Sequence, residues 1–218
     1  MSGKIRIAAL LSALVLLCGM LPGAGAFQDD DKITNPEDFA FLSGLGILVG
    51  DDQGNANPDA ALQRAQVAKM LFVAATGETD ASAYAGEQVF ADVYPGFWGE
   101  GYINYAAEKG IVSGRGMHAT GKPVFDPNTP VTLAEYLKIV LVHLGYDAAE
   151  EGMQDTPDWA ASVMALARET GLTAETGSGN SAISRADAAE ILTKVLKLDV
   201  KGPFALPDAF AVVTAASV

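Results

Sequence analysis

The sequence has few of the residues that build catalytic or metal sites. Its 218 residues include one cysteine and two histidines, and 14 Lys and Arg stand against 27 Asp and Glu. The formal net charge of −13 disfavours a nucleic-acid or anionic-membrane partner, because such binding needs clustered cations. Hydrophobic residues still make up 50% of the chain, which excludes wholesale disorder. The length allows one compact domain or several small repeated units.

The first 26 residues have the pattern of a secretory signal. Lys4 and Arg6 give a positive start, an apolar stretch of about 15 residues follows, and residues 24–26 are small. The apolar stretch is shorter than the roughly 20 residues of a bilayer span. We therefore expect residues 1–26 to be cleaved and the mature protein to be secreted. Cleavage would also remove Cys18, which excludes a disulfide, a thiolate metal site and a cysteine nucleophile.

Two short motifs recur in the rest of the chain. A glycine followed by an aliphatic residue occurs at Gly46, Gly110 and Gly171. A second motif follows each glycine, and its copies QRAQ, TLAE and SRAD begin at Gln63, Thr132 and Ser184. Because the two motifs recur in the same order, we interpret the chain as three copies of one unit.

Each unit is predicted to contain a helix, a loop and a second helix. The glycine is expected to end the first helix in a left-handed conformation. Thr132 and Glu135 match a capping box at the start of a second helix, whereas Gln63 and Gln66 do not, which predicts a less defined start there. The second helices have apolar residues at i, i+3, i+4 and i+7 spacing, a pattern that predicts one buried face. These residues are Val67, Met70, Leu71 and Ala74; Tyr136, Ile139, Val140 and His143; and Ala188, Ile191, Leu192 and Val195.

A single two-helix unit is too small to bury its own apolar face. We therefore predict a mostly α-helical protein whose three helix-loop-helix units form a pseudo-threefold bundle, with the loops lining grooves between units. The predicted organisation is a signal peptide at 1–26, repeats at 35–78, 88–147 and 153–198, and a C-terminal tail at 199–218.

These motifs resemble the S-layer homology repeat of bacterial surface proteins. The middle unit has the fullest set: FADV from Phe90, the tryptophan Trp98, GIVSG from Gly110, FDP from Phe125 and TLAE from Thr132. The resemblance implies non-covalent anchoring to the cell wall, by binding a peptidoglycan-linked secondary polymer with pyruvylated sugars in the grooves between repeats. It also implies a location at the cell wall or S-layer surface, other S-layer proteins as further partners, and no enzymatic activity or cofactor.

The candidate ligand residues are cations and aromatics, since a pyruvate carboxylate needs positive charge and a sugar ring needs an apolar surface. Arg64 and Arg185 match the arginine of the family motif TRAE, while Leu133 takes that position in the middle unit. The other candidates are Lys69 and Lys138, Arg115 in its glycine loop, and Trp98 and Trp159. For Arg64 and Arg185 the alternative is a structural salt bridge to the loop, and for Lys69 and Lys138 the favoured alternative is a solvated surface position. For each tryptophan, which is expected on an inward helix face, the favoured alternative is a core position.

Two other classes of function were weighed. The acidic stretch from Asp51 to Asp59 suggests a calcium-dependent dockerin-like module, but Ala56 and Leu62 occupy positions where a calcium loop needs Gly and Glu. An exported carbohydrate-active hydrolase could use paired carboxylates, for which Glu100, Glu108 and Asp126 are candidates. No nucleophile motif supports a hydrolase, and with only two histidines the sequence predicts no metal site.

Overall fold

The computed structural model describes residues 27–154 and 156–197, and this part of the chain is mostly helical. Within these ranges the structure has no β-strand, and short extended segments form only isolated bridges, so the predicted fold class is confirmed. The helices are η1 (Asp30–Lys32), α2 (Pro36–Gly44), α3 (Arg64–Thr76), η2 (Ser82–Tyr84), α4 (Glu100–Glu108), α5 (Leu133–His143), α6 (Trp159–Glu169) and α7 (Arg185–Lys197).

Two predicted segments, the signal peptide at 1–26 and the tail at 199–218, lie outside the described residues. In the part that is described, every helix is too short or too polar to cross a membrane.

The first helix of each unit ends where its glycine predicts. Gly46, Gly110 and Gly171 follow α2, α4 and α6 with φ values of 72°, 68° and 76°. These left-handed values are readily reached by glycine and disfavoured for other residues, so the glycines stop the helices. The first helix of the third unit, α6, begins at Trp159.

The second helices begin at equivalent places. Thr132 Oγ1 accepts a hydrogen bond from the Glu135 N–H at 3.2 Å, and Glu135 Oε2 accepts one from the Thr132 N–H at 2.9 Å, which confirms the predicted capping box. The expectation of a poorly defined start for α3 is wrong: Gln66 Oε1 accepts from the Gln63 N–H at 3.0 Å. The side-chain amide oxygen of Gln66 therefore takes the place that the Glu135 carboxylate has in the cap of α5.

The segments before α3, α5 and α7 meet in a closed cycle of backbone hydrogen bonds. Leu62 donates to the carbonyl of Ile183 at 3.0 Å, Ile183 donates to Val131 at 2.9 Å, and Val131 donates to Leu62 at 2.9 Å. At the start of each second helix, two backbone N–H groups also donate to carbonyls in the loop of another unit. Arg64 and Ala65 donate to Thr129 and Pro127, Leu133 and Ala134 donate to Ser181 and Gly179, and Arg185 and Ala186 donate to Ala60 and Pro58. The three segments are thus joined by the same pattern of bonds.

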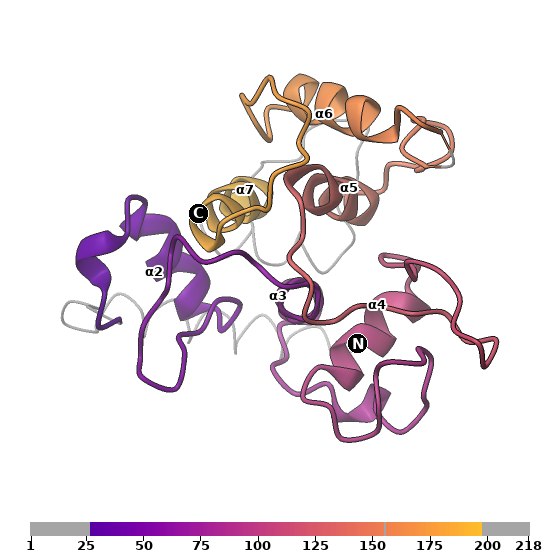
Figure 1. Ribbon diagram of the computed structural model, residues 1–218. Coiled ribbons are helices and arrows are strands. Elements are labelled where there is room, and N and C mark those ends of the chain that lie inside the picture. The colour runs from indigo at the N-terminus through magenta and orange to yellow at the C-terminus, as the bar shows by residue number, and fades with distance from the viewer. Residues whose placement is uncertain (1–26, 155, 198–218) are drawn as a thin grey trace, which may run out of the picture.

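The helices pair between units rather than within them. Helix α4 packs against α3, α6 against α5, and α2 against α7. Figure 1 shows α2, α4 and α6 at the periphery, with α3, α5 and α7 nearer the middle. The contact of α2 with α7 joins the first unit to the third, so the described part of the chain closes on itself.

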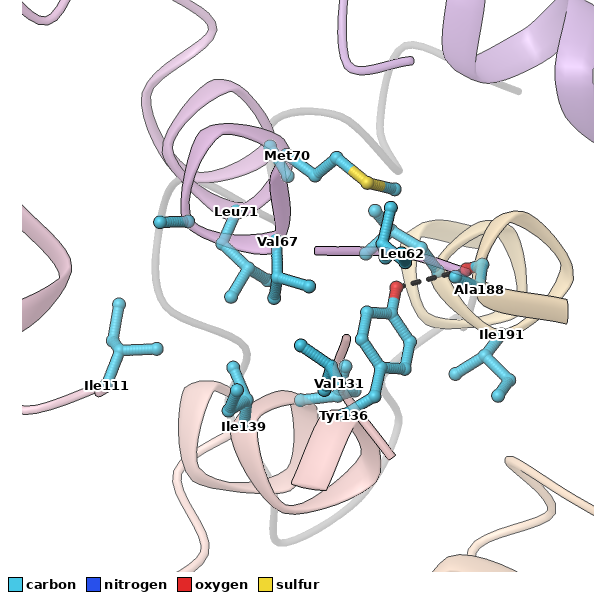
Figure 2. Close-up of a cluster of buried hydrophobic side chains, with 14 of the residues drawn as sticks. Leu62, Val67, Met70, Leu71, Ile111, Val131, Tyr136, Ile139, Ala188 and Ile191 are labelled. Carbon is cyan, nitrogen blue, oxygen red and sulfur yellow. Dashed lines mark hydrogen bonds between the residues drawn. The ribbon is translucent and has the colours of Figure 1, made fainter. Parts of the chain in front are cut away.

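The predicted apolar faces of α3, α5 and α7 form the centre of the core. All twelve predicted positions on these faces are buried, His143 among them. Figure 2 shows side chains from α3, α5 and α7 converging on one another, with Leu62 and Val131 from the preceding segments between them. Tyr136 is fully buried, and its O–H donates to the carbonyl of Ala188 at 3.0 Å. This bond satisfies the one polar group that its ring brings into the core.

Candidate ligand-binding grooves

The structure has three grooves at equivalent places, each beside the loop that follows a helix-ending glycine. Groove A, a hollow of about 530 Å³, lies along residues 47–52 and also includes Lys69, Trp98 and Arg185. Groove B, of about 150 Å³, lies along residues 111–115 and includes Arg64, Lys138 and Trp159. Groove C, of about 550 Å³, lies along residues 172–175 and includes Leu133, Glu190 and Lys194. Each groove combines residues from different predicted units.

Arg64 in groove B is buried and tied to the loop of the middle unit. Its Nε donates to the carbonyl of Phe125 at 2.7 Å, and Nη2 donates to Ser113 at 3.1 Å. The Cζ atom lies 4.5 Å from the centroid of the Phe125 ring. Burial is the main cause of its lowered pKa, and the nearby charge of Arg115 adds to it. An arginine remains charged despite such a shift, so this groove has a fixed cation.

Arg185 makes the same contacts in groove A. Its Nε donates to Ala56 at 2.8 Å, and Nη2 donates to Val49 at 2.8 Å. Ala56 corresponds to Phe125 and Val49 to Ser113 in the repeat. Two donors of each guanidinium thus hold a loop of another unit, and three N–H groups remain for other partners. Both arginines therefore hold a loop, through hydrogen bonds to backbone carbonyls.

An aspartate before the first helix of the unit supports each of these loops, and the repeat assignment missed the one in the first unit. Asp92 accepts from the N–H groups of Phe125 and Asp126 at 2.8 and 2.7 Å. Asp29 accepts from those of Ala56 and Asn57 at 2.6 and 2.9 Å. Phe27-Gln28-Asp29 therefore corresponds to Phe90-Ala91-Asp92, and the first unit's pattern begins before residue 35. The shared F-x-D sequence was a signal that could have identified it.

Lys69 and Lys138 lie five residues after the arginine position on α3 and α5, and each lines a groove with a tryptophan. Burial lowers the pKa of Lys69, and the charge of Arg185 lowers it further. Lys138 Nζ lies 5.5 Å from the centroid of the Trp159 ring. Both lysines are half-buried, which corrects the view of them as solvated surface residues.

The expectation of a core position is wrong for Trp98. Its side chain is 51% exposed, because Gly99 precedes α4 and the helix begins only at Glu100. Trp98 therefore lies in the segment before the helix rather than on its inward face. Trp159 is the first residue of α6 and is half-buried against the core. Both rings line grooves, as a sugar-stacking role requires.

Arg115 enters groove B in a different way. Its Nη2 forms a close ion pair with Glu135 Oε1. Burial by itself would raise the pKa of Glu135, but the hydrogen bond from Thr132 and the charge of Arg115 outweigh it and lower the pKa. The charge of Arg115 is therefore balanced by that of Glu135, the capping residue of α5. Arg64 and Lys138 are the other cations that line groove B.

Groove C lacks the cationic and aromatic features of the other two. Leu133 replaces the arginine, Glu190 replaces the lysine, and its lining includes no tryptophan. Its one lysine, Lys194, is paired with Glu190 at 2.7 Å. The loop residue Glu175 and the capping residue Asp187 add negative charge. Groove C therefore has more acidic than basic side chains, whereas groove B has more basic ones and groove A sets Lys69 and Arg185 beside Asp51 and Asp52.

Asp51, the first residue of the candidate calcium loop, is hydrogen-bonded within its own turn. Asp51 accepts from the N–H groups of Gln53 and Asn55 at 2.9 and 2.8 Å, and from Asn57 Nδ2 at 2.8 Å. The backbone bond from Asn55 is the main cause that lowers the pKa of Asp51 to about 2, and Asn57 contributes further. The carboxylate is thus occupied in holding its own turn.

The carboxylates considered for a hydrolase have structural positions. Glu100 is buried and accepts from the N–H groups of Gly86 and Gly96 at 2.8 and 3.0 Å. Glu108 pairs with its neighbour Lys109 at 2.9 Å. Asp126 adopts a positive φ of 58° in the turn held by Asp92. Each residue thus has a local role that explains its presence.

Comparison with known proteins agrees with the motifs. The family model of the S-layer homology domain matches residues 89–137. The "Middle cell wall protein" of Brevibacillus brevis is 26% identical over 204 residues, covering 90% of this chain and 18% of that protein. The "Surface layer protein" of Brevibacillus choshinensis is 27% identical over 157 residues, covering 69% of this chain and 13% of that protein.

A third relative comes from another genus. The "Cell surface protein" of Thermoanaerobacter kivui is 31% identical over 164 residues, covering 73% of this chain and 19% of that protein. This chain therefore spans less than a fifth of the length of these relatives. The matched domain, its motifs and these relatives together identify the chain as an S-layer homology domain protein.

Proposed function

We propose that the protein attaches non-covalently to the bacterial cell wall by binding an anionic secondary polymer in grooves A and B. The domain match and the surface-protein relatives support a secreted, cell-wall-associated and non-enzymatic role. The ligand we propose is a peptidoglycan-linked glycan with pyruvylated sugars, because a pyruvate ketal brings a carboxylate next to an apolar ring face. Other S-layer proteins are proposed as further partners.

One observation carries this proposal: the arginine, the lysine and the tryptophan occur together in two grooves and are replaced together in the third. If these residues served only to stabilise the repeat, groove C would need them as well. A cation pair next to an indole ring fits an anionic sugar, since the charge binds the carboxylate and the ring packs against the sugar. Although the chain has a net charge of −13, an arginine and a lysine lie together in each of these two grooves.

The lysines offer a cleaner test than the arginines, which also hold the loops. Lys69→Met and Lys138→Met keep most of the unbranched side chain and remove the charge. We expect each change to weaken retention on purified cell walls about tenfold at one groove, and the double variant to lose most retention, because two engaged grooves conceal a single loss.

Lys194→Met is the matched control, because it removes the same charge from groove C. It should sediment with walls as the parent does. Walls from which the secondary polymer has been extracted should retain none of the proteins. A folded Lys69→Met, Lys138→Met double variant that binds intact walls like the parent would show that these grooves are not the binding sites.

A further inference from the structure

Strongly exposed large hydrophobic side chains are few in the described part of the chain, and three of the four lie in groove A or are linked to it. They are Val49 at 47%, Tyr94 at 61%, Trp98 at 51% and Met117 at 70% exposure. Val49 and Trp98 line the groove. Tyr94 is connected to Trp98 through Phe97, with ring centroids 5.7 Å apart from Tyr94 to Phe97 and 5.6 Å apart from Phe97 to Trp98. Apolar surface concentrated in this way marks an interaction site.

The rings of Tyr94, Phe97, Trp98 and Tyr102 form what we name the aromatic cluster. Tyr102 lies 6.4 Å from Trp98 and connects the cluster to the core, because its ring centroid is 5.3 Å from that of buried Phe72. The Tyr102 O–H also donates to the carbonyl of Thr79 at 2.6 Å. The inner end of the cluster is thus fixed, and its outer end is exposed.

A tight turn holds the two outer rings in place. The Phe97 N–H donates to the Tyr94 carbonyl at 3.0 Å across Pro95 and Gly96, and Gly96 has a φ of 85°. Proline followed by a glycine of positive φ is typical of a type II turn. The Gly96 N–H donates to buried Glu100 at 3.0 Å. This explains the role of Glu100: it positions the turn, so little ordering is needed when a ligand binds.

The aromatic cluster is particular to groove A. In the sequence around Trp159 of groove B, Asp158 takes the position of Phe97 and Asp155 takes that of Tyr94. Trp159 itself lies close to Lys138. Groove B is thus lined by a single aromatic ring next to the charged Lys138, whereas groove A continues into several uncharged rings.

We propose that the aromatic cluster is a second subsite of groove A, which stacks on neutral sugar rings of the polymer whose anionic group binds at Arg185 and Lys69. This inference rests on the proposed function. Trp98 belongs both to the groove and to the cluster, so a glycan leaving the groove passes directly onto Phe97 and Tyr94. The uncharged rings match the C–H faces of sugars that lack a pyruvate.

The test measures the affinity of the full mature chain for polymer released from purified cell walls. Tyr94→Ser removes the most exposed ring, and Met117→Ser is the control, because Met117 is equally exposed but lines none of the three grooves. We expect Tyr94→Ser to weaken binding about three- to tenfold. The same loss is expected at about 50 mM and about 500 mM NaCl, because stacking on a neutral ring is not screened.

Lys69→Met should behave differently, with a loss that is large at low salt and smaller at high salt. A second readout uses a Trp159→Phe background, in which Trp98 is the one remaining tryptophan. The polymer should change Trp98 fluorescence, and Tyr94→Ser should shift this titration to higher polymer concentration by the same factor.

The outcomes separate the two proposals. If Tyr94→Ser binds like the parent while Lys69→Met is weakened, the subsite is wrong and the proposed function stands. If the parent itself does not bind the polymer, both are wrong. If Tyr94→Ser leaves polymer affinity unchanged but abolishes self-association in sedimentation, the cluster is a contact between copies of the chain and the subsite is overturned.

Discussion

At the scale of single residues, the two arginines show how one side chain can serve both fold and ligand. Each guanidinium crosses between units, with Arg64 donating to Phe125 and Ser113 and Arg185 donating to Ala56 and Val49. The sequence identified both positions from their motif. It could not reveal these contacts, because the partner carbonyls belong to loops of other units.

We predict that Arg64→Ala destabilises the protein by about 1–3 kcal/mol, because it leaves a buried carbonyl without its donor. Chemical denaturation measures the change. Arg115→Ala, which removes a partly exposed ion pair, should cost less than about 1 kcal/mol. Equal costs for the two variants would contradict the structural role of Arg64.

His143 gives the protein a pH-dependent stability. Burial lowers its pKa from 6.5 to about 4, so the folded state binds fewer protons than the unfolded chain between these values. The contribution of neutral His143 to the free energy of unfolding is therefore fully present above pH 6.5. It falls as the pH is lowered through this window, by about 1.4 kcal/mol per pH unit at most.

The variant His143→Val tests this, because valine already occupies the equivalent position at Val195. Thermal unfolding followed between pH 7 and about pH 4.5 should show a smaller loss for the variant than for the parent. The carboxylates titrate alike in both proteins, so the difference isolates His143. Parallel curves would show that the histidine does not contribute.

At the scale of helices and turns, the sequence predicted most of what its local signals control. The stop glycines, the cap formed by Thr132 and Glu135, and the buried faces of α3, α5 and α7 all follow from short-range spacing. One error concerned the start of α3, and another occurred where a turn delays a helix. The type II turn at Pro95 and Gly96 moves the start of α4 beyond Trp98, and this converted an expected core residue into an exposed one.

We predict that Thr132→Ala lowers the free energy of unfolding by about 1 kcal/mol, because α5 loses the hydroxyl that caps its N-terminus. Thr132→Ser keeps the hydroxyl and should lower the free energy of unfolding by less than about half as much. Urea denaturation of the two variants beside the parent gives the comparison. An alanine variant as stable as the serine variant would mean that the cap contributes nothing.

At the scale of the whole molecule, the repeat predicted three units in one bundle, but not which helices of different units pack against each other. The cycle through Leu62, Val131 and Ile183 and the pairing of α2 with α7 make each unit depend on the other two. The pseudo-threefold bundle and the repeat boundaries stay predictions, and the cycle is the observation that supports them. Periodicity identifies which faces are buried, whereas the choice of partner is a long-range property that one sequence does not reveal.

We predict that removing the chain after residue 155 abolishes cooperative unfolding of the remainder. The deletion takes away Ile183, which closes the hydrogen-bond cycle, and α7, which covers α2. Circular dichroism during heating should show a broad, shallow change. A single sharp transition in the shortened protein would contradict a shared core.

The central claim is that the protein has two binding grooves for one anionic polymer. It is tested most directly by calorimetric titration with a short oligosaccharide prepared from that polymer, which removes avidity. The parent should bind two oligosaccharides per chain. Lys69→Met and Lys138→Met should each keep one site of parental affinity and weaken the other about tenfold, and the double variant should have both sites weakened. Two sites of parental affinity in the double variant, or a third site in the parent that disappears with Lys194→Met, would contradict the account.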